Sequence, residues 1–147
     1  MRRLSLLALI LLIFPGELVA ENGDSVVIAH PQVAQSSVNH QQLRRIFLLK
    51  QRTWDDGSPI SLIVFASDNN THSEFLRQRL KMFPYQLERE WNKLIYSGQS
   101  APPVVATNTE DMLNIVASTP GAIGYLVTQQ PAMARHGRVK IIEVTNE

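Results

Sequence analysis

A short polar loop, Ser67-Asp68-Asn69-Asn70-Thr71, carries the residue types in this chain that are best suited to binding chemistry. It follows an apolar run, residues 60–65, and precedes a sequence that predicts a helix from about residue 72. The start of a helix offers backbone N–H groups and a favourable dipole to an anion, and hydroxyl groups add neutral donors. A carboxylate in the loop could accept the proton of a monohydrogen oxyanion. The candidate binding site for a small oxyanion comprises Ser67, Asp68, Asn70, Thr71 and His72.

The same segment also fits an ordinary loop that leads into a helix cap. The sequence Thr71-His72-Ser73-Glu74 matches a capping box, in which the Thr71 hydroxyl accepts from the N–H of Glu74 and Glu74 reaches back to Thr71. Glu74 would then place a negative charge in the turn that receives the anion. Both interpretations predict a helix over residues 72–83, but only the first predicts a binding site.

Other chemistry finds little support in the sequence. The four histidines, at positions 30, 40, 72 and 136, lack the spacing of metal ligands, so no metal site is expected. The chain has no cysteine, and no serine lies in a nucleophile-elbow sequence. Asp55 and Asp56 precede Gly57, which is typical of a turn rather than of a catalytic pair. We therefore expect neither a cofactor nor enzymatic activity.

The N-terminal segment has the layout of a secretory signal peptide. Arg2 and Arg3 precede an apolar run, residues 4–14, which Pro15 and Gly16 break before the small residue Ala20. The alternative, an uncleaved membrane anchor, is disfavoured because the run is shorter than the about 20 residues that span a bilayer. We expect cleavage after residue 20, export to the bacterial periplasm, and one domain over residues 21–147.

The charge balance argues against a nucleic-acid partner. The chain has 14 Lys and Arg against 13 Asp and Glu, and loss of residues 1–20 removes two basic residues and one acidic residue. The remaining domain is therefore formally neutral. Proteins that hold nucleic acid by bulk electrostatics need a marked positive surplus.

The hydrophobic pattern predicts strands alternating with helices. Strands are expected over residues 25–29, 60–65, 104–106, 122–127 and 139–144, and helices over residues 39–50, 72–83, 86–96 and 109–118. Phe83 is expected to be buried in the second helix, Pro84 to stop it, and Thr109 to cap the fourth. Leu48 and Leu49 extend the apolar face of the first helix, which predicts burial on two sides or a docked partner. Alternation of this kind indicates an α/β fold with a largely parallel sheet flanked by helices.

Several motifs together resemble one lobe of the substrate-binding proteins of phosphate ABC transporters, which have the type II periplasmic-binding-protein fold. The opening of the lobe is matched by residues 43–50, by Trp54-Asp55-Asp56-Gly57 and by Ile60. Its far end is matched by Ala101-Pro102-Pro103-Val104, by residues 112–116 and by Thr119-Pro120-Gly121-Ala122-Ile123-Gly124-Tyr125-Leu126. The resemblance extends over nearly all of residues 25–144.

The resemblance implies phosphate or another small oxyanion as ligand, with Asp68 at the position of the family's carboxylate and Thr71 at that of its threonine. The chain departs from the family in two respects. Its length allows about one lobe where the family has two, and residues 65–71 lack the family's arginine and glycines. Two hypotheses follow: an exported solute-binding-like protein, or a ligand-free interaction module of the envelope. The implied partners are the membrane subunits of an ABC transporter, another envelope protein or a second copy of the chain.

Overall fold

A computed structural model describes residues 23–128 and 137–146. The expected signal peptide, residues 1–20, lies outside the described residues. The strands are β1 (Asp24–Ala29), β2 (Ser37–Asn39), β3 (Ser61–Phe65), β4 (Val104–Ala106), β5 (Ala122–Thr128) and β6 (Lys140–Thr145). The helices are α1 (His40–Phe47), α2 (Asn70–Phe75), the π-helix η1 (Leu76–Leu80), α3 (Pro84–Tyr96) and α4 (Thr109–Ser118). Within these residues, the structure contains no helix that is long and apolar enough to cross a membrane.

The strands form one six-stranded sheet in the order β2-β6-β1-β5-β3-β4. The pairs β2–β6, β3–β4 and β3–β5 are parallel, whereas β1 is antiparallel to both of its neighbours, β5 and β6. Five of the six strands therefore share one direction, which confirms the prediction of a largely parallel sheet. The pairing leaves β4 at one edge of the sheet and β2 at the other.

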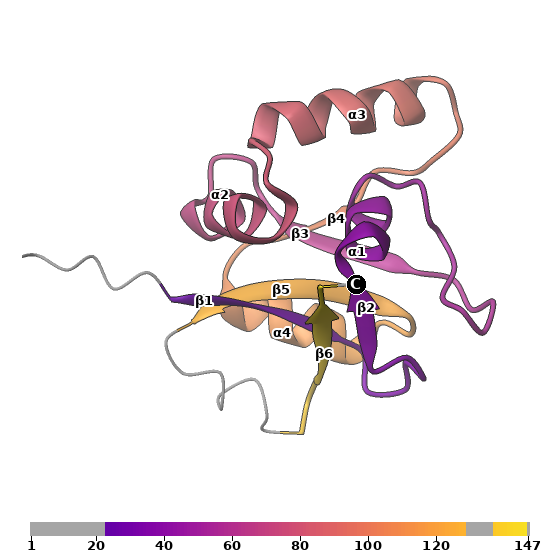
Figure 1. Cartoon of the computed structure of the whole chain (residues 1–147), viewed down its shortest axis with the longest axis vertical. Helices are drawn as coiled ribbons and strands as arrows, with labels where there is room; N and C mark the ends of the chain where they lie inside the picture. The colour runs from indigo at the N-terminus through magenta and orange to yellow at the C-terminus, as the bar shows by residue number, and fades with distance from the viewer. Residues whose placement is uncertain (1–22, 129–136, 147) are drawn as a thin grey trace, which may run out of the picture.

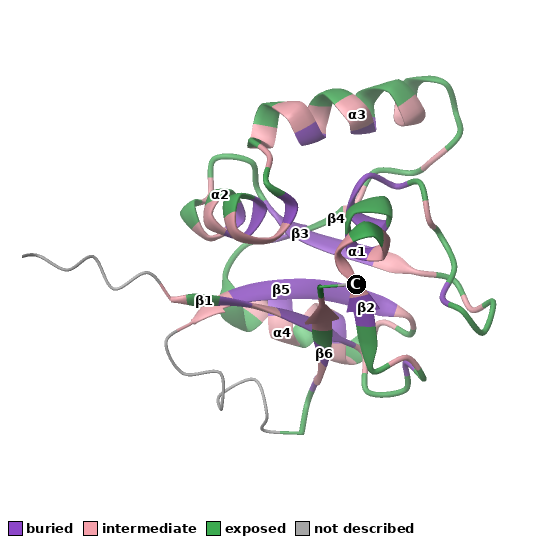
Figure 2. Cartoon of the chain, in the orientation of Figure 1, coloured by how far each residue is buried: buried purple, intermediate pink, exposed green. Residues whose placement is uncertain are grey.

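The helices cover the sheet on both faces (Figure 1). Helices α1, α2 and α3 lie on one side, and α4 lies on the other side against β5 and β3. Residues that face the sheet are buried, while the outer surface of α3 is largely exposed (Figure 2). This arrangement confirms the expected α/β architecture.

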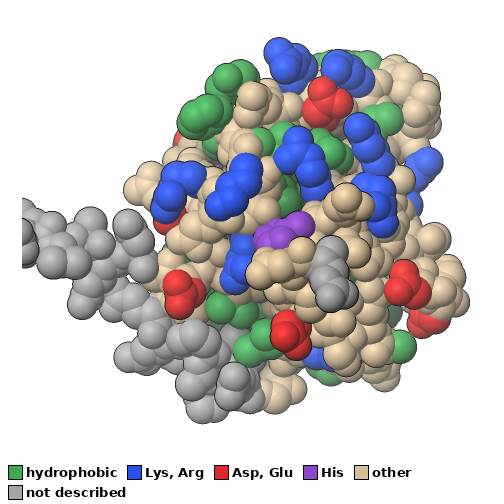
Figure 3. Space-filling model, viewed as in Figure 1, with side chains coloured by type: hydrophobic (Ala, Val, Ile, Leu, Met, Phe, Trp, Pro, Cys, Tyr) green, Lys and Arg blue, Asp and Glu red, His purple; other side chains and the backbone are tan. Residues whose placement is uncertain are grey.

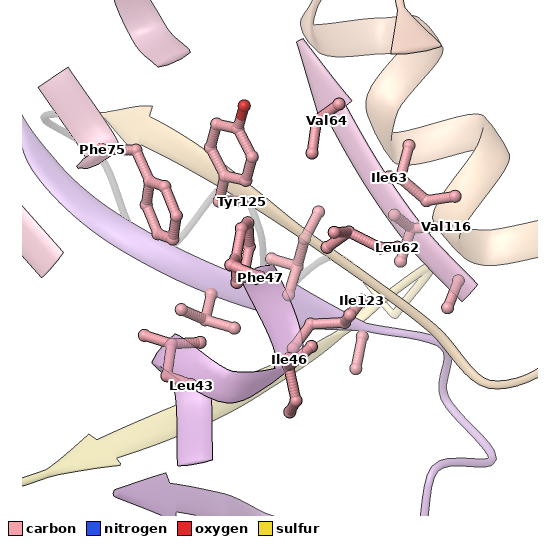
Figure 4. Packing of buried hydrophobic residues seen from close by; sticks show 14 of the residues in the cluster. Leu43, Ile46, Phe47, Leu62, Ile63, Val64, Phe75, Val116, Ile123 and Tyr125 are labelled. Atoms are coloured by element: carbon pink, nitrogen blue, oxygen red, sulfur yellow. The ribbon is translucent and has the colours of Figure 1, made fainter. Parts of the chain in front are cut away.

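An aromatic cluster fills the core between the sheet and helices α1 and α2 (Figure 4). The Tyr125 ring of β5 stacks on Phe75 with centroids 4.1 Å apart, and Phe47 lies 5.0 Å from Phe75. Helix α1 ends at Phe47, short of the expected residue 50, and Leu48 and Leu49, which follow it, are buried in the core as well. Burial of large aromatic side chains contributes the main share of stabilisation in such a core.

The two tryptophans also join separate elements. The indole N–H of Trp54 donates to the carbonyl of Gly121 at 3.0 Å, and that of Trp91 donates to the carbonyl of Phe47 at 2.6 Å. Both rings are buried. Their bonds tie the turn after α1 to the start of β5, and α3 to the end of α1.

Gly124 allows α4 to approach β5 closely. A Cβ atom at this position would lie 2.6 Å from Sδ of Met112 and 3.0 Å from Cγ2 of Val116. The glycine inside the predicted strand therefore marks a close contact with a helix, in keeping with the use of strand glycines where another element approaches closely.

The helical region after β3 differs from the prediction. The expected helix over residues 72–83 is divided into α2, the π-helix η1 and a separate segment, and Pro84 begins α3 instead of stopping a helix. Proline suits the first position of a helix because the N–H it lacks would have no partner there. Phe83 precedes α3 and is 63% exposed, so the prediction that it is buried was wrong. Helix α4 is capped by Asn108 and not by Thr109.

The π-helix holds the start of β1. Gln78 bonds to the N–H of Ser25 and the carbonyl of Gly23, at 2.9 and 3.0 Å. Arg79 donates to the hydroxyl and the carbonyl of Ser25, at 2.8 and 2.6 Å. The wider turn of a π-helix changes the angle between successive side chains, and in η1 the consecutive residues 78 and 79 both contact this strand.

Candidate ligand-binding loop

The candidate loop lies between the end of β3 and the start of α2, where the sequence predicted it. Ser67, Asp68 and Asn70 are exposed, and Thr71 is half-buried. These four residues are therefore close together and available to solvent. The side chain of His72, the fifth predicted site residue, is instead buried in the core.

Asn69 occupies the position that an anion would need. Its Oδ1 atom accepts hydrogen bonds from the N–H groups of Thr71 and His72, at 2.8 and 3.2 Å. Its carbonyl accepts from the N–H of Ser73 at 3.2 Å. An asparagine cap of this kind satisfies the donors at the start of a helix. Three of the donors that would attract an oxyanion are thus already bonded within the protein.

The predicted capping box of Thr71 and Glu74 is wrong. The N-cap is Asn69, and Thr71 is the second residue of the helix. Glu74 bonds to Arg77 and, at 2.6 Å, to Nε2 of Gln78. Its hydrogen bonds with Arg77 and Gln78 lower the pKa of this carboxyl. Asparagine ranks at the top of N-cap residues and threonine somewhat below, which explains the two-residue shift.

His72 faces the aromatic core. Its Nδ1 atom lies 2.5 Å from the hydroxyl oxygen of Tyr125, which also accepts a hydrogen bond from the N–H of Phe65 at 2.9 Å. We assign the Tyr125 hydroxyl as donor to Nδ1, because this tautomer gives the hydroxyl both an acceptor and a donor. The Nε2 atom of His72 is buried and has no hydrogen-bond partner among the described residues.

The electrostatics of this buried pair follow from its surroundings. Burial lowers the pKa of His72, an effect that the charge of Glu88 partly opposes. Burial also raises the pKa of Tyr125. Both side chains are therefore neutral near pH 7, and they form a polar link between α2, β3 and β5.

The loop has little positive charge. Residues 66–73 contain no Lys or Arg, and Asp68 contributes one negative charge. The nearby Arg77 is paired with Glu74. A bound oxyanion would therefore rely on the hydroxyls of Ser67 and Thr71 and on the amide of Asn70. Neutral donors of this kind form weaker hydrogen bonds than charged ones.

A cavity of about 470 Å³ lies elsewhere, between the end of α1, the start of β3 and the segment before β4. Leu49, which has a positive φ of 60°, lines this cavity with Ile46, Ile60 and Pro103. Arg52 donates to the carbonyl of Gln99 at the same place. In the described part of the chain, no group of three or more His, Asp or Glu side chains could hold a metal ion.

The roles of two residues in this region were not predicted from the sequence. Asn69 was treated as a loop residue, although its place before a helical sequence is typical of an N-cap. His72 was treated as a site residue, although it shares one helical face with Phe75 and Leu76, at spacings of three and four. That periodicity is the signal that could have predicted its burial.

Solved structures of phosphate-binding proteins have the same fold as this chain. PstS from Borrelia burgdorferi matches with a TM-score of 0.61 and 13% identity, over 84% of this chain and 47% of that protein. An ABC-type phosphate transport receptor from Vibrio cholerae matches with a TM-score of 0.60 and 14% identity, over 84% and 46%.

A phosphate ABC transporter substrate-binding protein from Clostridium perfringens, solved with bound phosphate, matches with a TM-score of 0.60, 15% identity, and coverage of 84% and 45%. The chain thus spans slightly less than half the length of these proteins. Its fold is that of one lobe of a binding protein of this kind, as the sequence motifs indicated. No protein-family model and no curated protein matches the sequence.

Proposed function

We propose that this chain is a non-enzymatic contact module of the bacterial envelope, built on the fold of a phosphate-binding lobe. One observation carries the proposal. Among the described residues, the exposed large hydrophobic side chains all lie between positions 83 and 105, which we call the 83–105 segment. They are Phe83, Tyr85, Tyr96, Val104 and Val105.

The exposed side chains occupy three places on the segment. The rings of Phe83 and Tyr85 stack on each other at 5.8 Å beside the start of α3, where hydrophobic side chains reach the surface (Figure 3). Tyr96 ends the same helix and is 87% exposed. Val104 and Val105 lie on β4, the strand at the edge of the sheet. Exposed apolar side chains and open strand edges are features through which one protein binds another.

The structure of the candidate loop also favours a role in protein–protein contact over tight binding of an oxyanion. The Asn69 side chain takes two of the N–H groups that an oxyanion would need, and the loop lacks a cation. A single lobe can instead contribute one face to a complex. The partners that suit this role are a membrane subunit of an ABC transporter, another envelope protein or a second copy of the chain.

The proposal is tested by the size of the native complex in a periplasmic extract. Sedimentation should find the wild-type protein in a species heavier than a monomer. The double variant Tyr85→Ser and Tyr96→Ser should return it to the monomer, whereas Gln41→Ser with Thr109→Ser, two exposed positions outside the segment, should not. A wild-type protein that sediments only as a monomer would contradict the proposal. Export itself is checked by N-terminal sequencing, which should begin at Glu21.

A second candidate function is weak binding of phosphate or another small oxyanion at the predicted loop. The exposure of Ser67, Asp68 and Asn70 favours it, because their polar groups can reach a ligand without displacing the core. Calorimetric titration with phosphate and with sulfate tests it. Saturable heat that the double variant Ser67→Ala and Thr71→Val removes would support this candidate; absence of heat at millimolar ligand would exclude it.

A further inference from the structure

A basic cavity lies on the helical side of the sheet, apart from the 67–72 loop. Its volume is about 390 Å³, and it is open to solvent between the end of α1, the end of η1 and the first half of α3. Arg44, Lys50, Lys81 and Arg89 line it, together with Gln86 and one acidic residue, Glu90. Figure 3 shows several Lys and Arg side chains on the helical side of the sheet.

The single acidic residue does not neutralise this cavity. Glu90 is paired with Lys93 at 2.9 Å, and its pKa is lowered by Lys93 first and by Lys50 and Arg89 to a smaller degree. Among the described residues, none of the four lining cations forms an ion pair with a carboxylate. Four cations against one carboxylate leave a surplus of positive charge inside a concave surface, although the domain as a whole is formally neutral.

Two of these cations lie at the end of η1. One N–H of the Arg44 guanidinium donates to the carbonyl of Leu80 at 2.7 Å, which fixes the side chain between α1 and the end of η1. Lys81, which follows Leu80 in the sequence, has a positive φ of 53° and ends the π-helix. A left-handed conformation is unfavourable for a lysine, and both such conformations and π-turns are found preferentially at functional sites.

We propose that this cavity binds an anion that carries two or more phosphate groups. A single tetrahedral oxyanion is much smaller than the cavity, so an anion with several phosphate groups suits its volume and its four cations better. Arginine pairs with phosphate through two parallel hydrogen bonds, and lysine adds compact charges that adapt to the remaining oxygens. The ligand is either a free inorganic polyphosphate or the phosphates of a lipid headgroup. None of these residues belongs to the 67–72 loop or to the set of exposed hydrophobic side chains.

Calorimetric titration with inorganic tripolyphosphate tests this site directly. The wild-type protein should bind with saturable heat, and the double variant Lys50→Gln and Arg89→Gln should bind at least about tenfold more weakly, because two charge-assisted contacts are lost. The double variant Arg45→Gln and Arg138→Gln removes the same charge outside the cavity and should bind as the wild type does. Absence of wild-type binding, or an equal loss in both variants, would overturn the proposal.

Two further measurements define the ligand class. Lys81→Asn retains a residue that tolerates a positive φ, so its weaker binding with unchanged thermal unfolding would support the site even if the double variant failed to fold. An oligoglutamate of matched charge should bind more weakly than tripolyphosphate; equal affinity would overturn the assignment to phosphate groups. Binding to cardiolipin vesicles that tripolyphosphate displaces would identify a lipid source, and tripolyphosphate binding without vesicle binding would identify the free anion.

Discussion

The Nδ1 atom of His72 lies 2.5 Å from the hydroxyl oxygen of Tyr125, deep in the core. The two residues are 53 positions apart in the sequence, and their contact joins helix α2 to strand β5. Because Tyr125 also accepts from the N–H of Phe65, one hydroxyl satisfies polar groups of two other elements. This contact accounts for the burial of His72, which the sequence predicted to belong to the ligand-binding site.

Tyr125→Phe should destabilise the protein by about 2–4 kcal/mol. The change removes the bonded hydroxyl and leaves the N–H of Phe65 and the imidazole of His72 buried without partners, each at a cost of about 1–3 kcal/mol. Urea unfolding measures the loss. Tyr85→Phe is the matched control, since Tyr85 is exposed, and should change stability by less than about 0.5 kcal/mol. Equal effects of the two substitutions would contradict the assigned role of the hydroxyl.

The stability of the protein should fall in mild acid because of His72. Burial lowers its pKa in the folded state below the unfolded value of about 6.5. Below that pH the unfolded chain therefore binds a proton that the folded chain does not, and the free energy of unfolding decreases until the folded pKa is reached. Urea titrations between pH 8 and pH 4 measure this decrease.

The matched variants are His72→Phe and His40→Gln. The first removes the buried imidazole and should reduce the decline in stability below about pH 6.5. The second replaces a half-buried histidine outside the core and should retain the decline. A wild-type decline that persists unchanged in His72→Phe would assign the effect to other groups.

Gly124→Ala should destabilise the protein by about 1–3 kcal/mol, because its Cβ atom would press on Met112 and Val116. Met112→Ala alone should cost about 2–5 kcal/mol through the cavity that it creates. The double variant should lose at least about 1 kcal/mol less than the sum of the two changes, since the new methyl group would occupy part of that cavity. Strictly additive losses would show that the close approach of α4 does not depend on Gly124.

Asn69→Ala should cost about 1 kcal/mol of stability, which is typical for loss of an N-cap. The reason is that the N–H groups of Thr71 and His72 would lose their acceptor. Thermal unfolding measures the change, with Asn70→Ala as control at the neighbouring exposed position. If the two alanine variants are equally stable, Asn69 does not act as the cap.

The sequence predicted the longer elements because their patterns are local. Leu43, Ile46 and Phe47 mark one face of α1, and the run before Phe65 marks a buried strand; both have a clear period. Strand β2 was missed because its three residues have little pattern of their own and pair with β6, near the other end of the chain. The π-helix was not predicted either, because Arg77, Gln78 and Arg79 are residue types that are equally common in an exposed α-helix.

The arrangement of the residues at the candidate site follows only in part from the local sequence. The position of the loop follows from the local sequence, and Ser67, Asp68 and Asn70 are exposed there. The burial of His72 depends on a tyrosine 53 residues away, and the exposure of Phe83 depends on the break between η1 and α3. The basic cavity joins residues 44–50 to residues 81–90, so no local pattern indicates it.

Site-specific photocrosslinking in living cells tests the proposed contact role most directly. A photoreactive amino acid is placed at Tyr85, Tyr96 or Val105, and at Thr109 of α4 as a control on the opposite side of the sheet. The proposal predicts an adduct of defined mass from positions in the 83–105 segment and none from Thr109. Absence of an adduct at all three positions, or the same adduct from Thr109, would contradict it.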